Sequence, residues 1–145
     1  MSSISLAQAT TIIDSALAEA RRNNFRPIIV LVLDDGGHVI ALKREDGTGY
    51  LATEIAWAKA WGAVGMGSAS RILGERMEAR PAVVAAIAAA SQGRFMAIPG
   101  GVLIRDASGR IVGAVGASGE TSDNDEKCAI AGVKATGLIA DNGKG

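Results

Sequence analysis

The chain has 145 residues, with 15 basic and 15 acidic side chains, one His, one Cys and five aromatic residues. This length fits a single domain, expected over residues 1–145. The balanced charge and scarce aromatics exclude the usual devices of nucleic-acid binding, which are a clustered basic excess and base stacking. No uncharged stretch could span a bilayer, no signal-peptide pattern opens the chain, and the lone Cys128 cannot form an internal disulfide. We therefore expect a soluble cytoplasmic protein without nucleic-acid or membrane partners.

Small residues dominate the composition. The 27 Ala and 19 Gly make up nearly a third of the chain. Such a core is built by close approach of backbones, and each element then buries little area. A subunit interface would add buried surface, so we expect a homo-oligomer.

The first predicted element is an amphipathic helix that begins after Ser5. Ser5 and Gln8 have the spacing of a capping box. Apolar residues then recur with a 3.6-residue period as far as Ala20, and the stripe ends near Asn23. We expect this helix to lie on a flat surface.

Two β-hairpins are predicted next. Residues 28–33 are a continuous β-branched and Leu run, typical of a strand buried on both faces, and residues 34–37 have turn chemistry. Residues 38–43 would return as the second strand. The second hairpin comprises strands over 101–105 and 110–116, joined by a turn over 106–109.

Helices are predicted between and after the hairpins. Pro81 stands where a first-turn proline belongs, and an acid-rich turn with Thr121 or Ser122 as the cap opens the last helix. The order of helix, hairpin, helices, hairpin and helix indicates an α+β fold with a helix-covered antiparallel sheet. The predicted helices cover residues 50–65, 72–77, 81–91 and 122–140.

The single histidine, His38, follows the turn of the first hairpin and would share one strand face with Ile40 and Leu42. Its imidazole could ligate a metal or haem iron, act as a general base, or bond a backbone carbonyl in the turn. One His and one Cys are too few for a typical four-ligand zinc site.

The helix over residues 50–65 is apolar almost all the way round, which predicts that it is covered on most sides. Trp57 and Trp61 are four residues apart and so share a face, which indicates a subunit interface or the wall of a ligand pocket. Lys59 lies on the same helix. A buried ammonium is costly unless it is paired, so Lys59 either reaches solvent or meets an anion.

Glycines and acids surround the second hairpin. Gly100 and Gly101 precede its first strand, and the glycine density of its second strand indicates that a ligand or another backbone packs against it. Asp125 and Glu126 follow in a turn too acidic for phosphate. They either complement the helix dipole or form a carboxylate site for a hard cation or proton transfer.

These motifs resemble the GlcG/HbpS family, which includes the C-terminal domain of PduO-type proteins. The resemblance extends over essentially the whole chain in the same order. It is carried by Asp35-Gly36-Gly37-His38, Arg44-Glu45-Asp46-Gly47, Ala58-Lys59-Ala60, Pro99-Gly100-Gly101-Val102, Val112-Gly113-Ala114-Val115-Gly116-Ala117-Ser118-Gly119 and Asp125-Glu126.

The resemblance implies a five-stranded antiparallel sheet flanked by helices, similar to a profilin or Roadblock-like fold, that assembles into dimers, tetramers or octamers. Some members bind haem or related tetrapyrroles, and others lie beside pathways that degrade small organic acids. The site implied for this chain lies near Lys59, Gly100, Gly101, Asp125 and Glu126.

Two functional hypotheses follow, beside a scaffold subunit without a ligand. The first is an oligomer that binds a small molecule, with haem or another tetrapyrrole as the leading ligand and His38 as the axial nitrogen. The second is a cofactor-independent hydrolase, isomerase or lyase acting on a small organic acid in catabolism. Its carboxylate-holding groups would be Lys59 and Arg44, its proton-moving groups Glu126, Asp125 and His38, and its further lining Gly100, Gly101 and Trp57.

Overall fold

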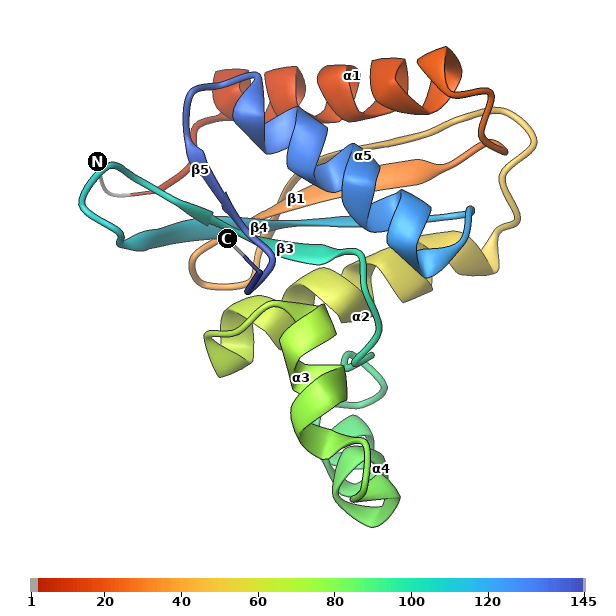
Figure 1. The fold of residues 1–145 in the computed structure, drawn as a ribbon, viewed down its shortest axis with the longest axis vertical. Coiled ribbons are helices and arrows are strands. Elements are labelled where there is room, and N and C mark those ends of the chain that lie inside the picture. The colour runs from red at the N-terminus through yellow and green to blue at the C-terminus, as the bar shows by residue number, and fades with distance from the viewer. Residues whose placement is uncertain (1–2, 145) are drawn as a thin grey trace.

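Two β-hairpins meet at the centre of a five-stranded antiparallel sheet in the computed structural model, which describes residues 3–144 (Figure 1). The strand order is β2-β1-β4-β3-β5. The central contact joins β1 to β4, and therefore the first hairpin to the second. The sheet confirms the predicted α+β class. The strands are β1 (Ile29–Asp34), β2 (Val39–Arg44), β3 (Gly101–Arg105), β4 (Ile111–Ser118) and β5 (Ile139–Asp141).

Helices cover both faces of this sheet. The helices α1 (Leu6–Arg22) and α5 (Ser122–Lys134) pack on one face, and α2 (Leu51–Met66) packs on the other (Figure 1). Two further helices, α3 (Ser70–Met77) and α4 (Pro81–Ala90), extend from the α2 side away from the sheet. The described residues contain no helix that is both long and apolar enough to cross a membrane.

The first helix begins with the predicted capping box. The Gln8 amide donates to the Ser5 hydroxyl oxygen at 3.1 Å, and the Ser5 amide donates to Gln8 Oε1 at 3.0 Å. The apolar stripe of α1 is buried against α5 and the sheet, which confirms that the helix lies on a flat surface. The strand β1 is apolar on both faces because each face is covered by a different helical layer.

The backbone of α2 packs directly on the sheet, because glycines of the sheet carry no side chains between them. Gly101 of β3 and Gly116 of β4 are cross-strand partners that face this helix. A Cβ atom on Gly116 would lie 2.1 Å from the Ala56 carbonyl oxygen, and one on Gly101 would lie 2.3 Å from the Lys59 carbonyl oxygen. The predicted close approach therefore exists, and a helix backbone fills it.

The last helix is shorter than the sequence pattern predicts. It ends at Lys134, so the prediction that it continues to residue 140 was wrong. Gly137 has φ of +80°, and the Thr136 hydroxyl donates to the Val133 carbonyl oxygen at 2.6 Å. Together they turn the chain out of the helix. The released segment pairs with β3 as the short edge strand β5.

A β-bulge changes the faces of β2. The register with β1 shifts between Val32 and Leu33, so Ile40 packs on the α1 side of the sheet. Leu42 pairs with Leu31, which belongs to the core on the α2 side. The expectation that Ile40 and Leu42 share a face was therefore wrong, because an extra residue in one strand reverses the alternation.

Candidate functional site

Lys59 forms a buried ion pair that joins α2 to α5. Its Nζ lies 3.0 Å from Asp125 Oδ2 and also donates to the Ala117 carbonyl oxygen of β4 at 3.0 Å. The Lys59 side chain is 1 % exposed and that of Asp125 is 2 % exposed. The prediction that this lysine reaches solvent or meets an anion is confirmed, and the anion is Asp125.

Burial dominates the electrostatics of this pair. It lowers the pKa of Lys59 and raises the pKa of Asp125, and the attraction between the two partners opposes both shifts. Asp125 Oδ1 also accepts from the Glu120 amide at 3.0 Å, so both carboxylate oxygens have partners. A Cβ atom on Gly100 would lie 2.8 Å from Lys59 Nζ. In this arrangement the pair links three elements and is closed to solvent.

Glu126 belongs to a second polar contact, between α3 and α5. Arg71 Nε donates to both Glu126 carboxylate oxygens at 3.1 and 3.0 Å, and its guanidinium also bonds Asp123. These two acids raise the pKa of Arg71 above its ordinary value. Asn142 donates to Glu126 Oε1 at 3.2 Å. Sequence reasoning missed Arg71, because an arginine on an amphipathic helix carries no sign of its distant partner.

The acid-rich turn caps the last helix. Thr121 is the N-cap, and its hydroxyl oxygen accepts from the Asn124 amide at 3.3 Å. Hydrogen bonds from the Thr121 amide and from Asn124 lower the pKa of Glu120 to about 2. No group of three or more His, Cys, Asp or Glu side chains suited to a metal ion occurs within residues 3–144. Cys128 is buried, which raises the pKa of its thiol to about 12.

His38 lies at the end of the β1–β2 turn with its imidazole 81 % exposed. Asp34 organises this turn: its Oδ1 accepts from the amides of Gly36 and His38, each at 2.9 Å. The same carboxylate lies 3.2 Å from His38 Nδ1. Burial opposes ionisation of Asp34, yet these hydrogen bonds and the imidazole lower its pKa below the ordinary value. A carboxylate at Nδ1 favours the tautomer whose Nε2 can accept a proton or ligate a metal.

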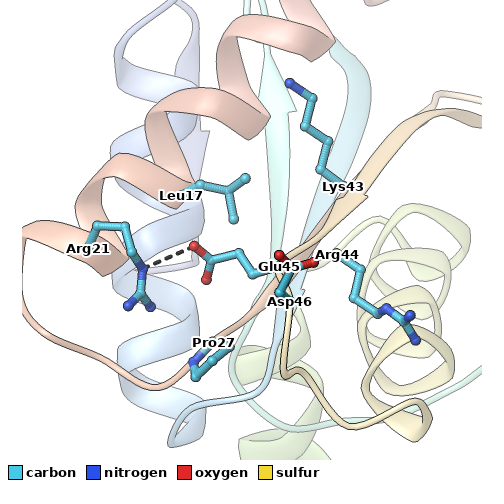
Figure 2. A pocket seen from close by; sticks show the side chains of 7 residues that line it. All are labelled: Leu17, Arg21, Pro27, Lys43, Arg44, Glu45 and Asp46. Atoms are coloured by element: carbon cyan, nitrogen blue, oxygen red, sulfur yellow. Dashed lines mark ion pairs between the residues drawn. The ribbon is translucent and has the colours of Figure 1, made fainter.

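Arg44 ends β2 beside a surface cavity of about 490 Å³. Figure 2 shows Lys43 and Arg44 extending in opposite directions from the strand. Arg21 and Glu45 close the other side of the cavity with an ion pair of 3.0 Å. Arg44 pairs with Ile29 across the sheet, which places its side chain on the α2 side.

Trp57 lines a different cavity, of about 350 Å³, together with Glu54, Gln92, Gly93 and Arg94. Trp57 is half-buried and packs against the α2-side core. Within residues 3–144 its indole Nε1 is buried without a hydrogen-bond partner. Sequence reasoning missed Gln92 and Arg94 as neighbours of this tryptophan, because the segment after α4 is remote from α2 in sequence.

The structure thus brings part of the predicted site together. Lys59, Asp125, Gly100 and Gly101 form one contact group, and Glu126 lies beside it but bonds Arg71. The other predicted residues lie elsewhere. His38 is in the first hairpin turn, Arg44 is at the sheet edge and Trp57 lines its own cavity. The enzyme hypothesis needs Lys59 and Asp125 to meet a substrate, whereas here they bond each other.

Comparisons with known proteins agree on the fold. The structure is similar to PduOC in complex with haem, with a TM-score of 0.85 and 22% identity, covering 96% of this chain and 99% of that one. It is also similar to the Klebsiella pneumoniae protein ORFY, with a TM-score of 0.84 and 22% identity, covering 94% and 92% of the two chains. At these identities the likeness concerns the fold alone.

HbpS is more similar in sequence. A Streptomyces reticuli HbpS double mutant matches with a TM-score of 0.78 and 27% identity, covering 92% of this chain and 87% of that one. Among curated proteins, none matches this sequence. The family model described as haem degrading protein HbpS-like matches residues 4–134. The chain therefore belongs to the HbpS-like family, as its motifs indicated.

Proposed function

We propose that this protein binds haem or a related tetrapyrrole, and that His38 Nε2 would ligate the iron. The observation that carries the proposal is the His38–Asp34 pair. In it a carboxylate lies 3.2 Å from one imidazole nitrogen, and the ring is 81 % exposed. A carboxylate behind a metal-binding imidazole orients the ring and fixes its tautomer. Membership of the HbpS-like family, and the structural likeness to a haem complex, support the same ligand class.

The strand β2, which begins directly after His38, exposes apolar side chains on one face. Val39 and Leu42 are 43% and 45% exposed, and their pairing with Leu33 and Leu31 places both on the α2 side of the edge strand. Arg44, which forms no ion pair within residues 3–144, lies on the same side and could meet a carboxylate at the ligand periphery. When bound, the iron would supply ligand exchange and redox chemistry, while the protein supplies the imidazole and its orientation.

We also propose that the protein is a homo-oligomer. The helix α4 has the sequence PAVVAAIAAA and contains no buried residue. A wholly apolar helix is normally covered, and the lack of charge favours another apolar helix over a polar partner. A second copy of the chain provides such a surface in the form of its own α4, through a self-complementary contact.

A hemin titration tests the haem proposal. Hemin added to the purified protein is expected to give a saturable Soret band, which His38→Gln shifts or abolishes. Asp34→Asn should weaken binding by about 10-fold to 100-fold, because it removes the charge that supports the imidazole. The matched control is Lys43→Gln, since Lys43 lies on the same strand but bonds Asp14 on the α1 side. The absence of a saturable band, or an unchanged band in His38→Gln, would disprove the assignment.

A further inference from the structure

The cavity beside Trp57 is lined by two side chains of opposite charge. Glu54 and Arg94 both line it, yet within residues 3–144 neither forms an ion pair. Six arginines of this chain do pair with a carboxylate, so pairing is the common arrangement here. Those six are Arg21, Arg22, Arg26, Arg71, Arg105 and Arg110.

Arg94 is held in place by contacts that involve no carboxylate. Its Nε donates to the Ser91 carbonyl oxygen at 3.0 Å, and its guanidinium carbon lies 4.4 Å from the centroid of the Trp61 ring. Stacking on an indole and one backbone acceptor fix the plane of the guanidinium. The two terminal nitrogens bond no other residue that the structure describes, and their fork geometry suits a carboxylate.

The local sequence explains this position. Gln92 and Gly93 have φ of +58° and +82°, so the chain reverses directly after α4. Phe95 then packs on α2 at Gly62, where a Cβ atom would lie 2.8 Å from the Phe95 ring. Between these two anchors, Arg94 is placed against the stripe of α2 that carries Trp61. Contacts of Arg94 and Phe95 with α2 therefore position the segment that forms one side of the cavity.

The third feature of the cavity is an aromatic wall. Trp57 lies one helical turn from both Glu54 and Trp61, and its indole N–H has no acceptor in the described part of the chain. The indole is thus held by packing, and a flat apolar group can lie beside it. A cavity of about 350 Å³ lies at the small end of the range for ligand pockets.

We infer that this cavity binds a small aromatic zwitterion, with its carboxylate on Arg94, its ammonium on Glu54 and its ring against Trp57. The chemical class follows from the lining, because each of the three groups matches one part of such a ligand. A plain carboxylate would leave Glu54 unpaired, and a plain amine would leave Arg94 unpaired. The site contains neither His38 nor Asp34, so it is distinct from the proposed haem site.

Titration with L-phenylalanine, followed by tryptophan fluorescence and calorimetry, tests this inference. We expect saturable binding, with benzoate and phenethylamine each binding more weakly because each lacks one charged group. Arg94→Gln should weaken phenylalanine binding by about tenfold or more, since a charge-assisted contact is lost. Glu54→Gln should weaken it by about twofold to fivefold, because Glu54 is exposed.

The control variant is Arg80→Ala, which removes an exposed arginine at the start of α4 outside the cavity. No saturable binding of phenylalanine, or equal affinity in the wild type and Arg94→Gln, would overturn the inference. Benzoate binding as tightly as phenylalanine would overturn the role of Glu54 and hence the zwitterion class. The hemin Soret band, measured on the same variants, is expected to stay unchanged, so this result and the haem result can fail separately.

Discussion

At the scale of single residues, the buried Lys59–Asp125 pair carries a large desolvation cost. Removing two charges from water costs several kcal/mol, and only good geometry and further hydrogen bonds offset that cost. Here the Ala117 carbonyl and the Glu120 amide supply those hydrogen bonds. The pair therefore specifies where α2, β4 and α5 meet, and either charge alone would be strongly unfavourable there.

This asymmetry predicts the outcome of a double-mutant cycle. Lys59→Met should lower the free energy of unfolding by about 3–5 kcal/mol, because it leaves a buried carboxylate unpaired. Adding Asp125→Asn should restore most of this loss, since Asn still accepts from the Glu120 amide. Chemical denaturation of the wild type, both single variants and the double variant measures the coupling. Additive effects would show that the two side chains do not interact.

The pH dependence of Lys59→Met gives a second readout of the same cycle. Burial already raises the pKa of Asp125, and loss of the cation raises it further. A carboxyl whose pKa is higher in the folded than in the unfolded state favours folding when protonated. The variant should therefore regain stability relative to the wild type as the pH falls from neutral towards the ordinary pKa of Asp. The double variant should show no such gain.

At the scale of elements, α2 is positioned by the absence of side chains beneath it. The paired glycines Gly101 and Gly116 let the backbones of Ala56 and Lys59 rest on the sheet. This contact sets the distance between α2 and the sheet, and therefore how deeply the Lys59 side chain is buried. Gly101, one of the glycines of the implied family site, is therefore required by packing.

Two glycine substitutions, one on this contact and one away from it, should have opposite effects on stability. Gly116→Ala places a Cβ atom 2.1 Å from a backbone oxygen, so it should destabilise the fold by about 3 kcal/mol or more. Gly65→Ala, within α2 itself, meets nothing within 4 Å and should stabilise by about 0.5–1 kcal/mol. Thermal unfolding of both variants measures the difference. Equal effects would contradict the backbone contact.

The sequence predicts most of these elements because the apolar periods are strong and the turns are marked by glycine. It fails at residues 135–141, where three strand residues are too few to show an alternating pattern and the helical period continues by chance. For the candidate site, the position of Lys59 on a covered helix predicts that its ammonium has an anionic partner. The identity of the anion is not predictable, because Asp125 lies 66 residues away.

At the scale of the whole molecule, the arm formed by α3 and α4 stands apart from the layered body (Figure 1). One face of α4 consists of Ala82, Ala85, Ala86, Ala89 and Ala90, all exposed. Their spacing follows the helical period, so the face is flat and allows close helix contact. Such a surface would be buried in the proposed oligomer.

Light scattering coupled to size-exclusion chromatography tests the role of this arm. Ala86→Glu is expected to reduce the assembly to a smaller species, because a charge cannot be buried unpaired in an apolar contact. The matched control, Ala18→Glu, lies on the exposed face of α1 and should leave the mass unchanged. A monomeric wild type, or an Ala86→Glu variant of unchanged mass, would contradict the proposal.

The central pairing of β1 with β4 also constrains how the chain folds. Ile29 of β1 is opposite Ser118 of β4, so the middle of the sheet forms only when both halves of the sequence are present. Long-range strand pairing of this kind slows folding. During synthesis, the edge of β1 that pairs with β4 must stay unpaired until the second hairpin leaves the ribosome. This interval is when the chain is most exposed to aggregation and most in need of a chaperone.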